Sequence, residues 1–296
     1  MKSQRLTGVA FLIPALLYVV LFFGYPLWKN VTTSFQDYTV RSFYTNVTPF
    51  IGLTNYAAVF HQPMFAKAAL NTALFTVGSI VFQFGIGLAL AVFFNGRFPG
   101  SETLRALLLL PWLLPLVVSS AVWRWMLDQD HGIINAALRT LHLAHEPVPW
   151  LTSTTWSLPA VILTNTWLGI PFNMIILHGG LRAIPDSLYE AAALDGANAW
   201  QQFRYVTWPL LRPVTGIVLM LGLVYTIKVF DVIMVVTGGG PANATETLTT
   251  WSYGLSFRDF AFGQAAVVGN VLIVVATVLG LIYLRMVRDA FSETAP

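Results

Sequence analysis

Six apolar runs of membrane-spanning length dominate the chain and leave it few possible folds. A helix needs about 20 mostly apolar residues to cross a bilayer, and it satisfies its own backbone hydrogen bonds there. Only 10% of the 296 residues are charged, whereas soluble domains carry about 25%. We therefore expect an all-α membrane protein with a single transmembrane domain at residues 1–296. Six transmembrane helices are expected at about residues 6–28, 69–94, 106–127, 156–178, 214–236 and 263–287.

The first apolar run is compatible with either a signal peptide or a retained helix. Lys2 and Arg5 precede it, as they would in a signal peptide, but no small-residue cleavage site follows. The sequence Gly24-Tyr25-Pro26 ends the run at membrane-spanning length. We interpret the run as an uncleaved first helix. Six helices then place both termini on one side of the membrane.

Lys and Arg residues are divided unevenly between the two faces that these helices define. The face with the termini carries Lys2, Arg5, Arg97, Arg105, Arg182, Arg204, Arg212, Arg285 and Arg288. The other face, with longer loops, carries Lys29, Arg41, Lys67, Arg124, Arg139 and Arg258. Because cytoplasmic loops carry the excess of Lys and Arg, we predict that both termini and the loop at 185–213 are cytoplasmic.

The loop at residues 185–213 is polar and rich in alanine, unlike the apolar runs on either side of it. Ser187 precedes Glu190 by three residues, and Asn198 precedes Gln201 by three, which is the spacing of a helix-capping box. Gly196 lies between them, where a helix end favours a left-handed residue. We expect a short helix, a glycine turn and a second short helix, closed by Pro209 and Pro213.

This loop resembles the "EAA" loop of the permease subunits of bacterial ABC importers. The matching positions are Glu190, Ala191, Ala192, Asp195, Gly196, Ala197, Phe203, Val206 and Pro209. Trp208 departs from the leucine that often precedes the proline in that family. The resemblance implies that the loop docks on a separate ATPase subunit. The alternatives are an ordinary amphipathic helical hairpin and a DNA-reading helix-turn-helix, and the latter would need a basic recognition face.

Several classes of chemistry are not supported by the sequence. It contains no GxxxxGK phosphate-binding loop, so ATP hydrolysis would take place on another chain. It has no cysteine, which excludes a disulfide framework or a thiolate metal site. His142 and His145 lack a third ligand nearby, so we predict no metal site. No basic run indicates a nucleic acid partner.

Two charged residues fall within the fifth apolar run. A spacing of three would place Lys228 and Asp231 on one helix face, where they can pair. Intramembrane charges normally face a cavity or a partner. Lys228 is therefore either part of a substrate pathway or half of a structural ion pair.

Three further segments resemble the carbohydrate-uptake branch of ABC importer permeases, the maltose and glycerol-phosphate group. They are residues 237–241 (TGGGP), 165–172 (NTWLGIPF) and 111–115 (PWLLP). In that group the matching helices line a sugar site at mid-membrane. Carried over by position, the resemblance implies a substrate path formed by Trp112, Asn165, Gly169, Phe172, Thr226 and Lys228. The extra N-terminal helices and large periplasmic insertion of the maltose-type subunit are absent from this sequence.

The resemblance covers nearly the whole chain and implies a type I ABC importer permease fold in the bacterial cytoplasmic membrane. It further implies a second, paralogous permease subunit, two ATPase subunits that bind ATP and Mg, an extracytoplasmic sugar-binding protein and a sugar substrate. This chain itself would be no enzyme and hold no cofactor. The alternative is a self-sufficient secondary transporter or channel. That class predicts ion-coupling residues in several helices, and carboxylates of this kind are lacking in the apolar runs.

Overall fold

The structure is a computed structural model that describes residues 12–96 and 98–292, with side chains up to residue 285. Residues 6–11 of the first predicted helix, as well as Lys2, Arg5 and Arg97, lie outside the described residues. After a helical segment at 12–19, the helices are η1 (Val20–Gly24), α2 (Tyr25–Ser34), α3 (Val40–Thr45), α4 (Thr54–His61), α5 (Pro63–Asn95), α6 (Ser101–Leu108), α7 (Leu110–Leu113), α8 (Leu116–Met126), α9 (Ile133–Thr140), α10 (Ser157–Arg182), α11 (Asp186–Leu194), α12 (Ala199–Gln202), η2 (Phe203–Thr207), α13 (Trp208–Ile227), α14 (Asp231–Val236), α15 (Leu248–Phe257) and α16 (Phe262–Ser292).

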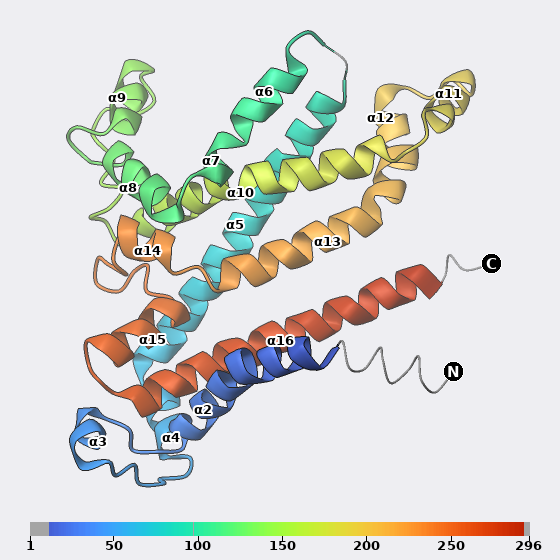
Figure 1. The fold of residues 1–296 in the computed structure, drawn as a ribbon. Coiled ribbons are helices and arrows are strands. Elements are labelled where there is room, and N and C mark those ends of the chain that lie inside the picture. Colours follow the sequence, from blue (N-terminus) through green and yellow to red (C-terminus); the bar gives the residue numbers. More distant parts are fainter. Residues whose placement is uncertain (1–11, 97, 293–296) are drawn as a thin grey trace, which may run out of the picture. The chain divides into compact units, whose positions relative to one another are not determined.

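The predicted all-helical fold class is confirmed, since the described residues form helices, loops and two isolated β-bridges. Five helices in this part of the chain are long and apolar enough to cross a membrane. A sixth span results if the bent pair α6–α7 and α8 counts as one. The helices of the described residues (Figure 1) belong to two compact units. One contains residues 12–66 and 251–274, and the other contains 67–96, 98–250 and 275–292.

In the first unit, a helix covers residues 12–34 without interruption. The predicted end at Gly24-Tyr25-Pro26 is therefore wrong. A π-helical turn at η1 precedes Pro26, and in it the Tyr25 N–H donates to the carbonyl of Val20. Pro26 then falls in the first turn of α2, a position where proline is tolerated.

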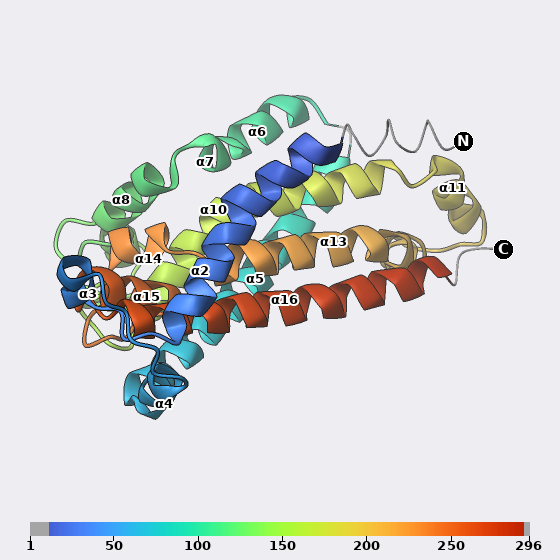
Figure 2. The ribbon, with the colours of Figure 1, turned by 60° about the horizontal axis from the view of Figure 1, so that its bottom comes forward.

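Side-chain amides hold the first unit together. The amide of Asn55 on α4 donates to the carbonyls of Ser34 and Gln36, at 3.0 and 2.9 Å. The amide of Asn30 on α2 donates to Asn270 Oδ1 on α16, at 2.8 Å. Figure 2 shows α2 alongside the first part of α16. Buried hydrogen bonds of this kind fix two apolar helices in one register.

In the second unit, α10 packs against both α5 and α13, and α10 and α13 run side by side (Figures 1 and 2). Gly87 on α5 lies against Asn173 on α10 so closely that an added Cβ would come within 2.6 Å of the Asn173 Cβ. Small residues at such crossings let helices approach each other in lipid. The close packing of α5 and α10 therefore depends on this glycine.

Two buried apolar clusters occupy different lengths of the same helices. One contains Phe75 of α5, Val161 of α10 and Ile233 of α14. The other contains Ala91 of α5, Leu177 of α10 and Val218 of α13. Between the two clusters lie about residues 76–90 of α5, 169–173 of α10 and 219–231, which include the end of α13. These middle stretches carry Gln83, Asn173, Thr226 and Lys228.

The third predicted helix, at 106–127, is not continuous. It consists of α6–α7 and α8, which meet at an angle of 98°. Leu114 is extended, with ψ of 145°, and Pro115 begins α8 as its N-cap. The residue before a proline avoids the helical region for steric reasons, so the chain turns at this point. The bend brings the short helix α7 toward the middle of α10.

The fifth predicted helix, at 214–236, is also broken. α13 ends at Ile227 and α14 begins at Asp231. The predicted common helix face for Lys228 and Asp231 is therefore wrong. Irregular backbone at membrane depth is tolerated where it lines a cavity, and this break lines one.

Candidate functional site

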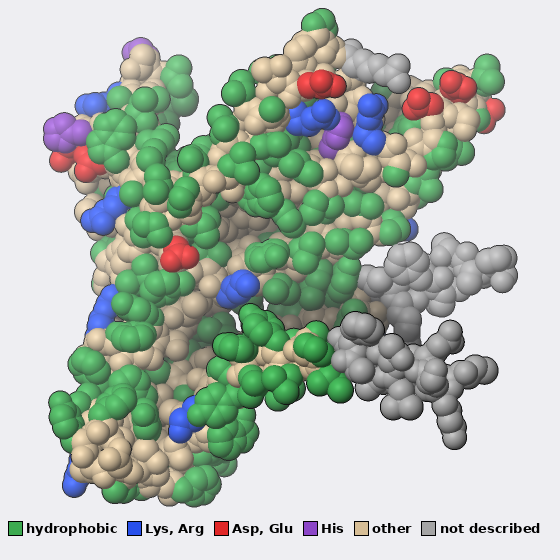
Figure 3. Space-filling model, viewed as in Figure 1, with side chains coloured by type: hydrophobic (Ala, Val, Ile, Leu, Met, Phe, Trp, Pro, Cys, Tyr) green, Lys and Arg blue, Asp and Glu red, His purple; other side chains and the backbone are tan. Residues whose placement is uncertain are grey.

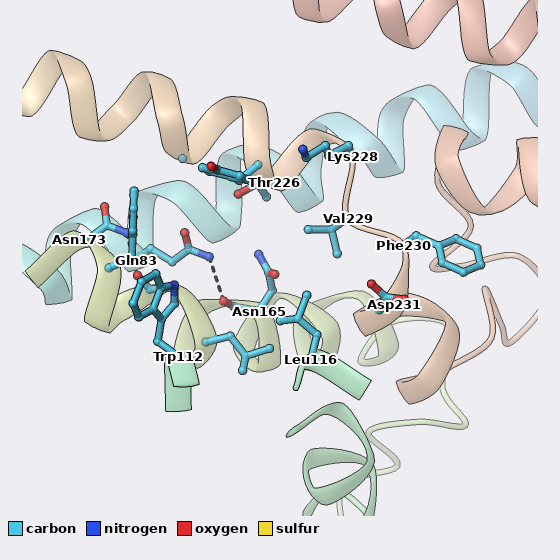
Figure 4. A pocket seen from close by; sticks show the side chains of 15 residues that line it. Gln83, Trp112, Leu116, Asn165, Asn173, Thr226, Lys228, Val229, Phe230 and Asp231 are labelled. Atoms are coloured by element: carbon cyan, nitrogen blue, oxygen red, sulfur yellow. Dashed lines mark hydrogen bonds between the residues drawn. The ribbon is translucent and has the colours of Figure 1, made fainter. Parts of the chain in front are cut away.

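A cavity of about 450 Å³ with a mostly apolar wall lies in the second unit (Figure 4). We name it the central cavity. Helices α5, α7, α8, α10 and α13 and the break after α13 contribute to its wall. All six residues of the predicted substrate path line it: Trp112, Asn165, Gly169, Phe172, Thr226 and Lys228.

Three aromatic rings form one wall of the central cavity. The ring centroids of Trp112 and Phe172 are 6.4 Å apart, and those of Phe172 and Tyr225 are 6.2 Å apart. Trp112 reaches the cavity because the bend at Pro115 turns α7 toward α10. Trp112 and Tyr225 remain more than half exposed. A wall of partly exposed rings presents flat apolar faces to a bound molecule.

Amide side chains form a polar part of the wall. Gln83 Nε2 donates to the backbone carbonyl of Asn165 at 2.9 Å (Figure 4). Gly169 makes room for this contact, because an added Cβ would lie within 3 Å of the Gln83 amide. Asn173 Nδ2 donates to the Gly169 carbonyl at 2.9 Å. Gly169 therefore shapes the site through its lack of a side chain.

The amide nitrogen of Asn165 is the unusual group in this site. The side chain is only 6% exposed, and its Nδ2 has no hydrogen-bond partner among the described residues. A buried donor left unpaired costs about 1–3 kcal/mol. The nitrogen itself has almost no exposed surface, so a molecule in the cavity would accept from it, and remove that cost, once the amide rotates.

The central cavity also contains one positive and one negative side chain. Lys228 Nζ lies 5.1 Å from the centroid of the Tyr225 ring, a cation–π distance. Asp231 begins α14, on the other side of the interruption between the two helices. In the described structure no ion pair joins Lys228 to Asp231, which removes the structural ion pair from the two alternatives for Lys228.

Sequence reasoning missed three polar and aromatic residues that line the cavity, Gln83, Asn173 and Tyr225, whereas it had singled out Asp231 as an intramembrane charge. Tyr225 and Asn173 are sequence neighbours of the predicted Thr226 and Phe172. Gln83 had one visible signal, since an amide is uncommon in the middle of an apolar run. The register between α5 and α10 was needed to place it opposite Asn165.

The predicted EAA-like loop forms α11, a glycine turn, α12 and η2, at the ends of α10 and α13 (Figure 1). Gly196 has φ of +80°, as predicted. The N–H of Ala197 donates to the carbonyl of Ala192, and that of Gly196 donates to Ala193. These two bonds form a Schellman motif, which ends a helix on a left-handed residue.

The two predicted capping boxes have different outcomes. Asn198 and Gln201 form a capping box, with bonds of 3.0 and 2.8 Å, so this prediction is confirmed. Ser187 does not cap a helix, because α11 begins one residue earlier, after Pro185, without a side-chain cap. The predicted closure at Pro209 and Pro213 is also wrong. The helix continues from α12 through η2 into α13, and η2 shifts the register before Pro209.

Most of the predicted coupling residues lie on the surface of this loop. Glu190, Ala191, Asp195, Gly196 and Pro209 are exposed, and Ala192, Ala197 and Phe203 are half-buried. Sequence reasoning missed three large apolar residues that the loop exposes: Leu194 at 90%, Trp200 at 69% and Tyr205 at 73%. The sequence could have revealed them, because they are bulky apolar residues in an otherwise polar loop. The loop therefore presents bulky apolar side chains outside the span that ends at Arg182.

Three comparisons place this architecture among known proteins. The chain is 34% identical to the sulfoquinovosyl glycerol transport system permease protein SmoG of Agrobacterium fabrum, over 97% of this chain and 92% of that protein. It is 33% identical to the trehalose/maltose transport system permease protein MalF of Thermococcus litoralis, over 95% of each. A crystal structure of a bacterial alginate ABC transporter, in complex with an alginate pentasaccharide-bound periplasmic protein, contains a chain of the same fold. Its TM-score is 0.82 at 23% identity, covering 97% of this chain and 96% of that chain.

Residues 83–291 match the family of inner membrane components of binding-protein-dependent transport systems. This stretch contains the whole EAA-like loop and all six predicted substrate-path residues. It is more than half of the chain. The chain therefore belongs to this family, as a non-enzymatic transmembrane subunit of an ABC importer in the inner membrane.

Proposed function

We propose that this subunit imports a sugar and that the central cavity is its part of the sugar path. The observation that carries the proposal is the buried, unpartnered Asn165 amide in a cavity with an aromatic wall. Sugars offer apolar C–H faces that stack on rings and hydroxyl groups that accept from amides. The names of the two relatives, a sulfoquinovosyl glycerol and a trehalose/maltose permease, agree with a sugar substrate.

We further propose that the EAA-like loop couples the path to a separate ATPase. ATP and Mg would bind on two ATPase subunits, and their closure would move the loop and reorient the helices. Exposed Leu194, Trp200 and Tyr205 supply the apolar contacts of such a docking surface. A second permease subunit, a paralogue, would complete a path of which this chain is one transmembrane domain. A sugar-binding protein outside the membrane would deliver the substrate, as the family description implies.

A mass-spectrometric inventory of what co-purifies with the tagged chain in mild detergent tests this assignment. We expect an ATPase, a second permease of this family and a binding protein to appear together. Reconstitution of the purified chain into liposomes tests the alternative function. Sugar uptake by the purified chain alone, in liposomes without ATP, would instead support the secondary transporter or channel. The family membership favours the importer subunit over that alternative.

The cytoplasmic location of the EAA-like loop and both termini is part of the proposal and can be tested by labelling. The chain has no native cysteine, so single cysteines at Ser187 and His145 report on one site each. Both residues are exposed and lie in the second unit. Thr245 would be a poor reporter, because its side chain is fully buried.

We expect an impermeant maleimide to label the His145→Cys variant, but not Ser187→Cys, in right-side-out spheroplasts. Permeabilised spheroplasts should label at both positions, which controls for accessibility. Labelling of Ser187→Cys alone in sealed spheroplasts would reverse the proposed orientation.

A further inference from the structure

Basic side chains gather where α6 approaches the end of α10 (Figure 3), and none of these side chains lines the central cavity. Arg105 on α6 and His178 and Arg182 on α10 line two adjoining pockets of about 490 and 570 Å³. We name these three residues the basic cluster. Neither the proposed sugar path nor the EAA-like loop uses Arg105 or His178. The cluster therefore needs an explanation of its own.

Among the described residues no carboxylate lies within ion-pair distance of the basic cluster, although Arg182 shares a further pocket with Asp186 and Glu190. Arg105 Nη1 lies 3.0 Å from Nε2 and 3.3 Å from Nδ1 of His178, so the guanidinium contacts an imidazole and not a carboxylate. Glu102 lines both pockets. Among the described side chains it forms no ion pair with Arg105 or Arg182. Two guanidinium groups held near one pocket favour an anion that accepts hydrogen bonds.

The basic cluster lies at the expected level of the membrane surface. Arg182 is the last residue of the α10 span, and the EAA-like loop follows it. The second pocket continues from the cluster along Ala106, Leu109 and Ile175. Ile175 precedes Arg182 by seven helical residues, which is about 10 Å at 1.5 Å per residue. The pocket therefore extends from charged groups toward apolar groups along the direction of an acyl chain.

We propose that the basic cluster binds the phosphodiester head group of an anionic phospholipid of the inner leaflet. Its acyl chain would follow Leu109 and Ile175. Basic pockets between transmembrane helices on the cytoplasmic side are suited to such head groups. The apolar continuation of the pocket favours a lipid over free phosphate, which would gain nothing from Leu109 or Ile175. The placement in the inner leaflet rests on the orientation proposed above.

The test compares lipid binding to the intact importer complex by native mass spectrometry. The complex is titrated with phosphatidylglycerol or with phosphatidylcholine. The variant Arg105→Gln/Arg182→Gln removes both guanidinium groups. Arg212→Gln is the matched control, because Arg212 is an exposed arginine near the start of α13 and lines neither pocket. Inorganic phosphate is added as a competitor in a further arm.

We expect the double variant to bind phosphatidylglycerol about 30-fold more weakly, equivalent to about 2 kcal/mol at about 1.4 kcal/mol per tenfold change. Phosphatidylcholine binding and the Arg212→Gln variant should be unchanged. Equal phosphatidylglycerol binding by wild type and double variant would overturn the proposal. Displacement by millimolar phosphate would overturn it in favour of a free-anion site.

A photoreactive phosphatidylglycerol provides a test that needs no variant. Cross-links in the wild-type complex are expected on the peptides that contain Arg105 and His178. Cross-links confined to other helices would contradict the site. Loss of the second permease subunit from the double variant, with unchanged lipid binding, would show that the cluster contacts a partner protein. All of these outcomes are independent of sugar uptake, so they do not test the proposed function.

Discussion

Replacing Gly196 by valine is expected to reduce ATP-driven sugar uptake about tenfold while the chain still folds and inserts. Gly196 has φ of +80°, a conformation that costs an L-residue about 1–2 kcal/mol, and more for a β-branched one. An added Cβ would meet no atom within 4 Å, so the cost comes from the backbone and not from a clash. The loop conformation that docks on the ATPase would then be populated about tenfold less.

Gly196→Asn provides the matched control for this prediction. Asparagine adds a larger polar side chain but adopts the left-handed conformation more readily than other residues. We expect uptake near the wild-type level for Gly196→Asn, with ATPase association and turnover measured in the same proteoliposomes. Full substrate-stimulated turnover and uptake by Gly196→Val would show that this turn does not carry the coupling. An equal loss in both variants would show that side-chain bulk matters more than the backbone conformation.

The positions of the long helices could be predicted from the sequence because the bilayer imposes a length and a composition on each of them. Their interruptions could not. Proline alone did not identify them, since Pro171 and Pro213 lie inside continuous helices and Pro115 lies at a 98° bend. A proline need not break a membrane helix, because neighbouring groups can satisfy the backbone carbonyl that it leaves free. The break after Ile227 had no proline signal at all.

The central cavity was predicted better than the contacts inside it. A resemblance of short segments placed six residues in one site, and all six line the cavity. Lys228 and Asp231 share no helix face, because the helix is interrupted between Ile227 and Asp231. Gln83 was missed because its position against Asn165 depends on Gly169, a contact between two helices that sequence spacing does not reveal.

The second large effect is expected at Asn165. Replacing Asn165 by alanine should raise the substrate concentration needed for half-maximal uptake about threefold to tenfold, because one hydrogen bond to the sugar, worth about 0.5–1.5 kcal/mol, is lost. Its Nδ2 has no partner among the described residues, so removing it breaks no hydrogen bond from that atom. The Asn165 carbonyl still accepts from Gln83 in the variant. Assembly, basal ATP turnover and thermal stability should therefore stay near normal.

Thr166→Ala is the matched control, because it separates a ligand-binding amide from buried polarity in general. Thr166 is the next residue on α10, is 3% exposed, and its hydroxyl also lacks a partner in the described structure. It does not line the central cavity.

A second pair of variants tests the aromatic wall. Trp112→Ala is compared with Leu113→Ala on the same short helix, where both residues are more than half exposed. We expect impaired uptake only for Asn165→Ala and Trp112→Ala. Wild-type uptake by both at every substrate concentration would place the sugar path elsewhere, whereas loss of assembly would assign these side chains to packing.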